Sequence, residues 1–342
     1  MAMTCHPLTL WIVPACLLLV ACGLTRTAAM PPADAEAEPA EATFEDTLVL
    51  ENEALTLSVA PGVGRIVGLT PAGGKNLMWL TSAENAAEGE AEDKWVNLGG
   101  DKIWPALQAM WGRYLPHGGG WPPDPSLDGS AWEVVEHDER RVVIRSPLAP
   151  ELKVRITRVI ELDPTRPRVV IHNTIERVER SIFPVHIWSV SQLDQPRYAL
   201  LGVEQRWPQG PQGHELHAIW GSQAKDQASA NVTPLADHNA IRWDFDHEGG
   251  GKVGTLGTWC AAVFDDWAVV HQTAFDPAGS YPDASNIQTY THGQYIELET
   301  LSPQAHPQPG ETIDNTVVWT LIPVQDRDDA ALVEAIEQLP AP

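Results

Sequence analysis

The chain has 342 residues, of which 46 are Asp or Glu and only 22 are Lys or Arg, so its formal net charge is −24 at pH 7. A surface this acidic repels the phosphates of nucleic acids and of anionic lipids, which excludes both as electrostatic partners and leaves sugars and other neutral small molecules open. The hydrophobic fraction of 43% is enough for a large core and too high for a disordered chain.

A short apolar run, residues 8–20, lies near the start of the chain. This run is shorter than the roughly 20 residues that span a bilayer. It is typical of a signal peptide, although no Lys or Arg precedes it. It ends in Leu19-Val20-Ala21-Cys22, which is similar to the lipobox of bacterial lipoproteins, where the signal is removed and the Cys is lipidated.

The lipobox resemblance implies that residues 1–21 are a signal peptide and that Cys22 carries the lipid. It places the protein in the bacterial cell envelope, on the outer membrane or another extracytoplasmic face, with the lipid anchor as its membrane contact. An ordinary secretory signal that happens to contain a Cys is the alternative.

Residues 22–46 form a second segment, which is rich in Ala, Pro and Glu and has no hydrophobic period. We expect a flexible acidic tether there. Cys5 and Cys16 fall inside the predicted signal, so Cys260 is the one cysteine left in the mature domain, and an internal disulfide framework is excluded. Since Cys260 lies in an apolar run, we expect a buried core residue rather than a nucleophile.

From Thr47 onward, short runs of alternating apolar and polar residues follow one another, separated by turn residues. The clearest run, residues 153–161, places Val154, Ile156, Arg158 and Ile160 on one face, and this period of two indicates a half-buried antiparallel strand. Successive strands without intervening helices favour an all-β fold, a large antiparallel β-sandwich over residues 47–325. The ranges expected to form strands are 48–50, 55–59, 65–69, 131–135, 141–144, 152–162, 168–175, 259–264, 267–273, 287–290, 295–300 and 316–322.

The one helix that the pattern predicts lies in the C-terminal tail, residues 326–342. Over residues 328–339, four apolar side chains share a face at helical spacing, and the first turn is acidic. These four residues are Leu332, Val333, Ile336 and Leu339.

Two long segments, residues 82–130 and 202–251, interrupt the strands. Loops this long in a compact domain are usually functional. A sugar suits Trp beside charged residues, because its C–H faces stack on indole while its hydroxyls bond to polar groups. The alternative is that these Trp close the ends of the sandwich. The Trp in the two segments are Trp95, Trp104, Trp111, Trp121, Trp207, Trp220 and Trp243.

The candidate sugar-binding residues come mainly from the first long segment. Asp101 and Lys102 follow two glycines, which predicts a tight turn that presents both side chains at a cleft; a solvated, salt-bridged turn is the alternative. Trp104 and Trp121 are the candidate stacking platforms. Three further candidates with polar side chains are Arg113, His117 and Arg65, the last with a charge at a strand edge as its alternative.

Three stretches carry a resemblance to a known family. They are NLGGDKIWP (residues 97–105) with GWPPDP (120–125), FPVHIWS (183–189), and YIELETLSP (295–303) with QPGE (308–311) and VW (318–319). Together they resemble an uncharacterised bacterial domain-of-unknown-function family related to galactose mutarotase (aldose 1-epimerase). The resemblance covers roughly residues 47–324. It implies the galactose mutarotase-like form of β-sandwich, with a carbohydrate as partner.

The resemblance also implies an active site. Mutarotases carry a Leu-Glu-Thr-x-x-x-Pro-like stretch near the C-terminus, and its Glu is the catalytic base. Residues 298–303 match at the Glu and the Thr, with the Pro one position early, so Glu299 is the candidate base. The acid of the family is a His in an Asn-His-x-Tyr-Phe-Asn motif, which this sequence lacks. His186, in the comparable region, is the candidate acid.

Mutarotation opens and recloses a sugar hemiacetal, as a base takes the proton of the anomeric hydroxyl while an acid protonates the ring oxygen. Alternation over residues 295–300 puts Tyr295, Glu297 and Glu299 on one face, with Ile296 and Leu298 on the core face. Two carboxylates on one face would raise the pKa of one of them, which suits acid/base work. A solvated outer face explains the same pattern equally well.

Metal and cofactor signals are weak. His214-x-x-His217 and Asp244-x-Asp246-His247 offer ligand types without a closed set. The sequence has no Gly-rich phosphate loop, no Gly-x-Ser-x-Gly motif and no Cys pair. We therefore predict no metal ion and no cofactor.

The sequence leaves three functions open. The first is a carbohydrate-active envelope lipoprotein with aldose 1-epimerase-like isomerase chemistry. The second is a carbohydrate-binding lipoprotein without catalysis on the same scaffold. The third is a structural envelope protein whose Trp serve only the core.

Overall fold

Residues 39–342 form one compact unit. The structure, a computed structural model, describes residues 40–106, 108–204, 217–218, 231–235, 237–244, 250–325 and 327–342. The predicted signal peptide, Cys22 and most of the predicted tether lie outside these residues. In the described part of the chain, no helix is long and apolar enough to cross a membrane.

The last residues of the predicted tether pack against the domain. The Ala42 N–H donates to the Thr81 carbonyl at 2.8 Å, and the Ala83 N–H donates to the Ala40 carbonyl at 2.8 Å. The Ala42 side chain is buried. The folded domain therefore begins before Thr47, and composition missed this because small side chains held by backbone hydrogen bonds leave no hydrophobic period.

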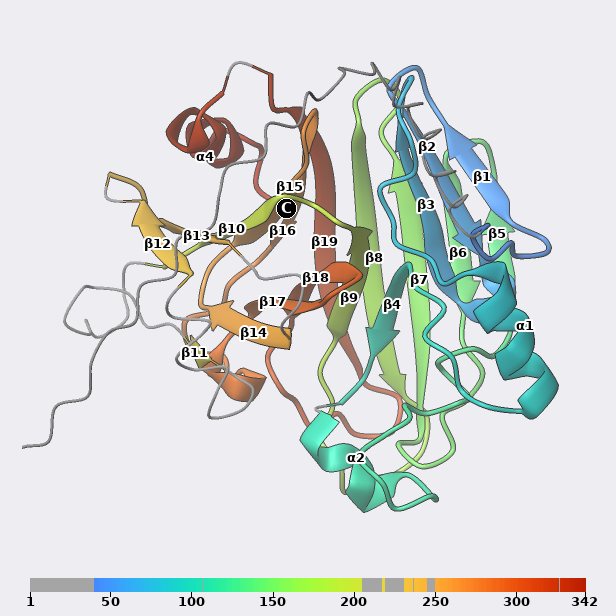
Figure 1. The fold of residues 1–342 in the computed structure, drawn as a ribbon. Helices are drawn as coiled ribbons and strands as arrows, with labels where there is room; N and C mark the ends of the chain where they lie inside the picture. The colour runs from blue at the N-terminus through green and yellow to red at the C-terminus, as the bar shows by residue number, and fades with distance from the viewer. Residues whose placement is uncertain are drawn as a thin grey trace, which may run out of the picture. The chain divides into compact units, whose positions relative to one another are not determined.

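Two large antiparallel sheets make up the domain (Figure 1), which confirms the predicted all-β sandwich. The first sheet has nine strands. In spatial order they are β1 (Leu48–Glu51), β2 (Leu55–Ala60), β3 (Arg65–Pro71), β4 (Asp101–Trp104), β9 (Trp188–Asp194), β18 (Tyr295–Leu301), β17 (Ile287–His292), β14 (Gly250–Thr255) and β11 (His217–Ala218).

The second sheet has ten strands, and each strand pairs antiparallel with its neighbours. Near its centre, the pair β8 and β19 brings residues 168–176 beside residues 312–320. In spatial order the strands are β12 (Val232–Leu235), β13 (Ala240–Trp243), β10 (Tyr198–Gly202), β15 (Trp259–Val263), β16 (Trp267–Thr273), β19 (Thr312–Pro323), β8 (Arg168–Arg177), β7 (Val154–Leu162), β6 (Arg141–Arg145) and β5 (Glu133–His137).

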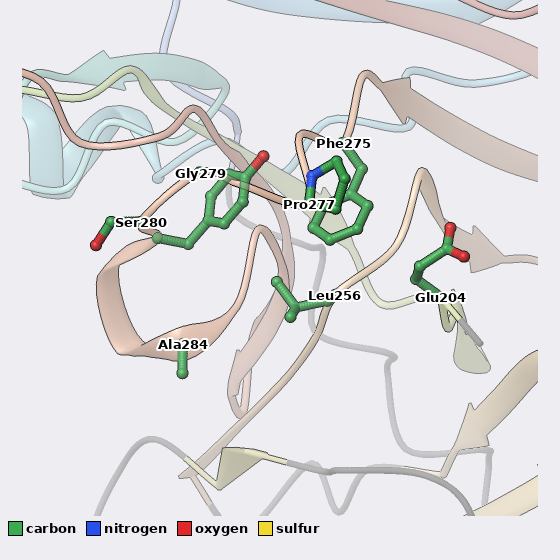
Figure 2. Close-up of a pocket in the computed structure, with 8 residues that line it drawn as sticks. Glu204, Leu256, Phe275, Pro277, Gly279, Ser280 and Ala284 are labelled. Atoms are coloured by element: carbon green, nitrogen blue, oxygen red, sulfur yellow. The ribbon is translucent and has the colours of Figure 1, made fainter. Parts of the chain in front are cut away.

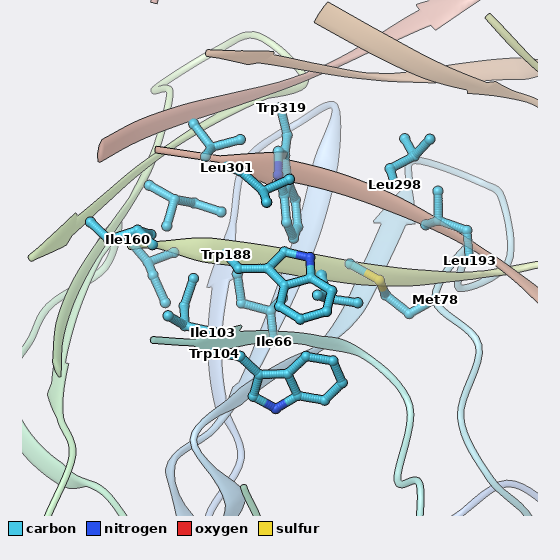
Figure 3. Close-up of a cluster of buried hydrophobic side chains, with 14 of the residues drawn as sticks. Ile66, Met78, Ile103, Trp104, Ile160, Trp188, Leu193, Leu298, Leu301 and Trp319 are labelled. Carbon is cyan, nitrogen blue, oxygen red and sulfur yellow. The ribbon is translucent and has the colours of Figure 1, made fainter. Parts of the chain in front are cut away.

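The main core draws its side chains from both sheets. On β7 the predicted alternation is confirmed, since Val154, Ile156, Arg158 and Ile160 are all buried and the residues between them are partly exposed. The strand β18 contributes Leu298, and Figure 3 shows this cluster around β9 and β18. Cys260 on β15 is fully buried, as predicted, and burial raises the pKa of its thiol well above the usual range.

The predicted C-terminal helix is confirmed as α4 (Asp329–Glu337). Its N-cap is Asp328, whose side chain accepts a hydrogen bond from the Ala331 N–H at 2.9 Å. The buried face of α4 packs in a second, smaller hydrophobic cluster with residues of β10, β15 and β16 (Figure 1). The helical residues on that face are Leu332, Val333 and Ile336.

Two further helices lie in the first long segment, where a loop was expected. They are α1 (Ala83–Glu92), capped by the Ser82 side chain, and α2 (Gln108–Tyr114). Two single 3₁₀ turns, η1 (Pro61–Val63) and η2 (Pro282–Ala284), complete the elements of the described residues. The helix α1 consists mainly of Ala and Glu, which are strong helix formers. It buries little apolar surface, so its sequence lacks the helical hydrophobic period that would have predicted it.

Several strands were also missed by the sequence patterns. The strands β4, β9 and β10 are buried on both faces, so they lack the alternation of a half-buried strand. The strands β11, β12 and β13 lie within the second long segment, which was expected to be a loop, and β14 begins at its end. The second long segment is therefore partly sheet in its described residues.

Candidate functional site

A cavity of about 380 Å³ opens on the outer face of the nine-stranded sheet. The two faces are distinguished at β4, where Asp101 contacts Arg158 of the other sheet, so Lys102 and Trp104 point the opposite way. Strands β4, β9, β14, β17 and β18 form the floor, and the first long segment supplies a wall. The described residues that line the cavity are Trp95, Asn97, Lys102, Trp104, Gln108, Trp121, Trp188, Gln192, Lys252, Tyr290, Tyr295 and Glu297.

The register of the sheet explains why these polar residues meet. Gln192 on β9 pairs with Glu297 on β18, Glu297 pairs with Tyr290 on β17, and Tyr290 pairs with Lys252 on β14. Directly paired residues lie about 4.5–5.5 Å apart and share a face. One row across four strands therefore places an amide, a carboxylate, a phenol and an ammonium side by side on the cavity floor.

Four indoles enclose the cavity. Trp104 meets Trp188 edge to face, with ring centroids 5.0 Å apart, and Figure 3 shows the two side by side. Trp121 is 45% exposed and packs edge to face on Trp95, with ring centroids at 4.6 Å. Trp121 is supported from behind by buried Trp111, stacked at 5.7 Å. The sequence prediction of an aromatic cluster in the first long segment thus matches the position of the cavity wall.

Glu299 lies in the next row of the floor, paired in register with Val190 of β9 and Gln288 of β17. It is fully buried. Its Oε2 accepts hydrogen bonds from Trp188 Nε1 at 2.6 Å and from Lys252 Nζ at 2.7 Å. Its Oε1 has no hydrogen-bond partner among the described residues.

Burial raises the pKa of Glu299 to about 7, against the opposing effect of the Lys252 ammonium. A carboxyl group with this pKa exchanges its proton near neutral pH, which is the property required of a general acid or base. The predicted shared face of Tyr295, Glu297 and Glu299 is present in the structure. This face is buried rather than solvated, because Glu299 is fully buried and Glu297 is only 8% exposed.

Glu297 and Lys102 are the charged groups at the wall side of the floor. Glu297 Oε1 accepts a hydrogen bond from Gln192 Nε2 at 2.8 Å. The Lys102 ammonium lies 5.0 Å from the centroid of the Trp104 ring. Burial lowers the pKa of Lys102 to about 8, helped by nearby Arg65 and opposed by the carboxylates of Glu297, Asp128 and Asp101.

The structure places His186, the predicted acid, just before β9 and outside the lining of the cavity. It is fully buried, and both ring nitrogens lack hydrogen-bond partners in the described part of the chain. Its ring stacks on Trp188 at 6.4 Å, so Trp188 contacts both His186 and Glu299. Burial lowers the pKa of His186 to about 3, and the imidazole is therefore neutral at pH 7.

Asp101 and Arg65 differ from the expectation that they face a cleft. Asp101 points to the inner face, where it pairs with Arg158 and accepts a hydrogen bond from Ser191 Oγ at 2.7 Å. Arg65 is buried between Asp128 Oδ1 at 2.5 Å and the Gly99 carbonyl at 2.6 Å. Adjacent strand residues point to opposite faces, so only one of the pair 101 and 102 can reach the cavity.

Arg113 and His117 are exposed and do not appear among the residues that line the cavity. His117 holds its own loop together, since its Nδ1 accepts from the Gly119 N–H and its Nε2 lies 3.1 Å from the Pro122 carbonyl. Thus, of the seven predicted sugar-binding residues, Lys102, Trp104 and Trp121 line the cavity.

Sequence reasoning missed several lining residues, above all Lys252, Gln192 and Tyr290. Lys252 follows three glycines that lack the flanking strand and helix of a phosphate loop, and it lies instead within β14. Trp188 belongs to the second stretch of the family resemblance, which was the one signal that pointed towards it.

Metal ligation has no support in the described residues, which contain no group of three or more His, Cys, Asp or Glu placed to hold an ion. The candidate ligands His214, Asp246 and His247 lie outside the described residues, as do Trp207 and Trp220. Trp243 is buried in β13.

A second cavity of about 310 Å³ lies near η2 (Figure 2). Its lining is mainly apolar, with the Phe275 and Tyr281 rings stacked at 5.8 Å and one carboxylate, Glu204. None of the residues predicted from the sequence lines it in the described part of the chain. Lacking convergent polar groups, it is the weaker candidate for a specific site.

Comparison with known proteins supports the fold alone. No protein-family model and no curated protein sequence matches the chain. A galactose mutarotase-like protein from Lactobacillus casei superposes with a TM-score of 0.51 at 10% identity, covering 81% of this chain and all of that one. A galactose mutarotase related enzyme from Lactobacillus acidophilus superposes with a TM-score of 0.52 at 9% identity, covering 82% of this chain and 99% of that one. The chain therefore has the fold of the galactose mutarotase-like proteins.

Proposed function

We propose that the protein binds a carbohydrate in the cavity on the outer face of the nine-stranded sheet. One observation carries this proposal: four indoles line the same cavity as buried hydrogen-bonding side chains of positive and negative charge. Indole faces suit the C–H faces of a sugar ring, and Glu297, Gln192 and Lys102 suit its hydroxyls. The cavity volume of about 380 Å³ falls within the roughly 300–1,000 Å³ of small-molecule sites.

Tryptophan fluorescence and calorimetry against a panel of monosaccharides and oligosaccharides test the proposal. Trp121→Ala removes the exposed platform, and we expect sugar affinity to fall by at least about fivefold, or about 1 kcal/mol. Ile182→Ala, which removes another exposed apolar side chain that does not line the cavity, is the matched control and should leave affinity unchanged. If no sugar shifts the fluorescence or releases heat, the cavity is not a carbohydrate site. That result would favour a structural envelope protein whose Trp serve only the core.

Aldose 1-epimerase-like catalysis is the second candidate function, and Glu299 favours it. A buried carboxyl group with a pKa of about 7, one row from the cavity lining, can take the anomeric hydroxyl proton. The ring oxygen must then gain a proton as its bond to the anomeric carbon breaks. The ammonium of Lys252, 2.7 Å from Glu299, is better placed to supply it than His186, which is neutral and lies outside the lining.

Polarimetry on freshly dissolved α-glucose and α-galactose tests this second function. The protein should accelerate mutarotation, and Glu299→Gln should slow the catalysed rate by about 100-fold or more, as expected for loss of a general base. Glu53→Gln, at an exposed position before β2, is the control and should keep the full rate. Sugar binding without acceleration of mutarotation would mean that the protein binds carbohydrate but does not catalyse this reaction.

A lipid anchor at Cys22 and a place in the bacterial cell envelope remain part of the proposal, supported by the apolar run and the Leu-Val-Ala-Cys stretch. Incorporation of labelled palmitate into the full-length protein tests the anchor. We expect label in the wild type, no label in Cys22→Ser, and release of the variant from the membrane fraction. Equal labelling of both proteins would refute the anchor.

A further inference from the structure

Lys102 differs from the other buried basic residues. Five Lys or Arg side chains are buried in the described part of the chain, namely Arg65, Lys102, Arg158, Arg177 and Lys252. Three of them form ion pairs, and Arg177 donates to the carbonyls of Leu152 and Phe183. Lys102 alone has no oxygen partner among the described residues, although it is only 3% exposed.

An ammonium without an acceptor is costly to bury. The Trp104 ring at 5.0 Å offsets part of this cost through a cation–π contact. That contact leaves the three N–H donors of the ammonium unused. Because Lys102 lines the cavity, these donors are open to whatever enters it.

We propose that the cavity takes a sugar bearing a carboxylate, such as a uronic acid, and that this carboxylate pairs with the Lys102 ammonium. The proposal rests on the proposed carbohydrate site and specifies its ligand. The other charges on the floor are already engaged, since Lys252 pairs with Glu299 and Glu297 accepts from Gln192. Lys102 is left to recognise one added negative charge.

A carboxylate fits this site better than a phosphate. None of the twelve described lining residues is an Arg, the side chain best suited to phosphate through two parallel hydrogen bonds. Glu297 also lines the cavity and would repel the second charge of a phosphate dianion. One ammonium and neighbouring amides match a single carboxylate.

The net charge of −24 does not oppose this ligand at short range. At about 0.15 M ionic strength, exposed charges are screened beyond about 8 Å, whereas a pair formed inside a buried site is screened much less. The contact between Lys102 and a bound carboxylate is therefore governed by the cavity and not by the distant acidic surface.

Calorimetry with galacturonate and glucuronate against galactose and glucose tests the inference at pH 7. We expect the wild type to bind a uronate at least about tenfold more tightly than the neutral sugar, the gain of one charge-assisted hydrogen bond. Lys102→Met should abolish this preference, so that the uronate binds no more tightly than the neutral sugar. Lys75→Met, which removes a largely exposed charge elsewhere, is the matched control and should keep the preference.

A second measurement on the wild type stays valid if Lys102→Met fails to fold. The pKa of Lys102 is about 8, set by burial, Arg65, Glu297, Asp128 and Asp101, so the uronate preference should shrink as the pH rises from 7 towards 10. A preference that is absent at pH 7, or unchanged across this range, overturns the inference.

The remaining outcomes separate the inference from the proposed function. Neutral sugars bound as tightly as uronates would refute the carboxylate and leave the carbohydrate site intact. Galactose 6-phosphate bound more tightly than galacturonate would replace the carboxylate with a phosphate. The absence of binding by every sugar would refute both proposals.

Discussion

Asp101 and Lys102 are neighbours on β4, and each is a buried charge. Their surroundings differ because they lie on opposite faces of the nine-stranded sheet. Asp101 lies on the inner face, and both of its carboxylate oxygens have partners, one in Arg158 and the other in Ser191 Oγ. Lys102 lies on the outer face and is also buried, with the Trp104 ring beside it but no oxygen partner among the described residues. The first charge joins two sheets, and the second is available to a ligand.

The same contrast extends along the outer face. Around the cavity, Trp104 Nε1, Gln192 Oε1 and Glu299 Oε1 are buried atoms without hydrogen-bond partners in the described residues. Native proteins leave few such atoms, and a group of them beside one cavity needs an explanation. Binding of a polar ligand supplies one, because its hydroxyls and carboxylate can fill these positions. A structural charge is therefore recognised by its oxygen partners inside the fold, and a candidate binding group by unused hydrogen-bonding atoms on a cavity wall.

Asp101→Asn gives the strongest test of the contrast. It leaves the Arg158 guanidinium buried without a counter-charge, and we expect the free energy of unfolding to fall by about 3–5 kcal/mol. Lys102→Met removes an ammonium that has no oxygen partner in the described part of the chain and loses only the contact with the Trp104 ring, so it should change stability by less than about 1 kcal/mol or increase it. Urea unfolding of the two variants and the wild type measures both effects.

The opposite ranking would contradict the contrast. If Lys102→Met destabilised the fold as strongly as Asp101→Asn, Lys102 would be a structural charge and its role as a ligand group would lose its physical basis.

The two buried histidines give a smaller, pH-dependent effect. His186 lies beside the cavity floor and His271 stacks on Trp319 in the core at 4.7 Å, and burial lowers the pKa of each to about 3. The unfolded chain binds protons at these side chains below about pH 6.5, where the folded chain does not. Each therefore lowers stability by up to about 1.4 kcal/mol per pH unit as the pH falls from about 6.5 towards 3.

Glu299 has the opposite effect on the pH dependence of stability. Its pKa in the folded state, about 7, lies above its ordinary value. Its contribution therefore increases stability as the pH falls from about 7 towards 4.5. Comparing variants cancels this term. His186→Phe and His271→Phe should each flatten the loss of stability between pH 6.5 and 4.5, measured by urea unfolding, whereas His137→Phe at an exposed position should not. Parallel curves for all three variants would show that the buried imidazoles bind protons in the folded state.

The sequence predicted the outline of the fold where one face of a strand is exposed. The alternation on β7 correctly placed even Arg158 on the core face, and the spacing of Leu332, Val333 and Ile336 predicted α4. It failed on β4 and β9, because strands buried on both faces have no period of two. For that reason it could not decide whether Asp101 or Lys102 faced the cavity.

The candidate site was predictable only in part for a related reason. Alternation on β18 put Tyr295, Glu297 and Glu299 on one face, and the Trp-rich segment supplied the wall. Lys252 and Gln192 reach the same floor through strand register. This register joins Lys252 to Tyr290, 38 positions away, and Gln192 to Glu297, 105 positions away, and no local pattern encodes it. The ion pair of Arg65 with Asp128 was likewise invisible, because its partners are 63 residues apart.

The smallest effect that we predict comes from that ion pair, which holds a wall residue in place. Asp128 Oδ2 accepts a hydrogen bond from Trp95 Nε1 at 2.7 Å, while its Oδ1 pairs with Arg65. Trp95→Phe keeps an aromatic ring against Trp121 and leaves the ion pair intact, but frees the ring from Asp128. We expect sugar affinity to fall by about fivefold, the value of roughly 1 kcal/mol for one hydrogen bond, with little change in stability.

Trp132→Phe is the matched control for this variant, because it also removes an indole hydrogen bond, to the Leu127 carbonyl at 3.4 Å, but at a residue that does not line the cavity. It should leave sugar affinity at the wild-type value in the same titration. Equal affinity in Trp95→Phe and the wild type would mean that packing alone fixes the wall. A loss in Trp95→Phe alone would show that a fully paired charge behind the outer face, although it cannot touch a ligand, still sets the position of the surface that does.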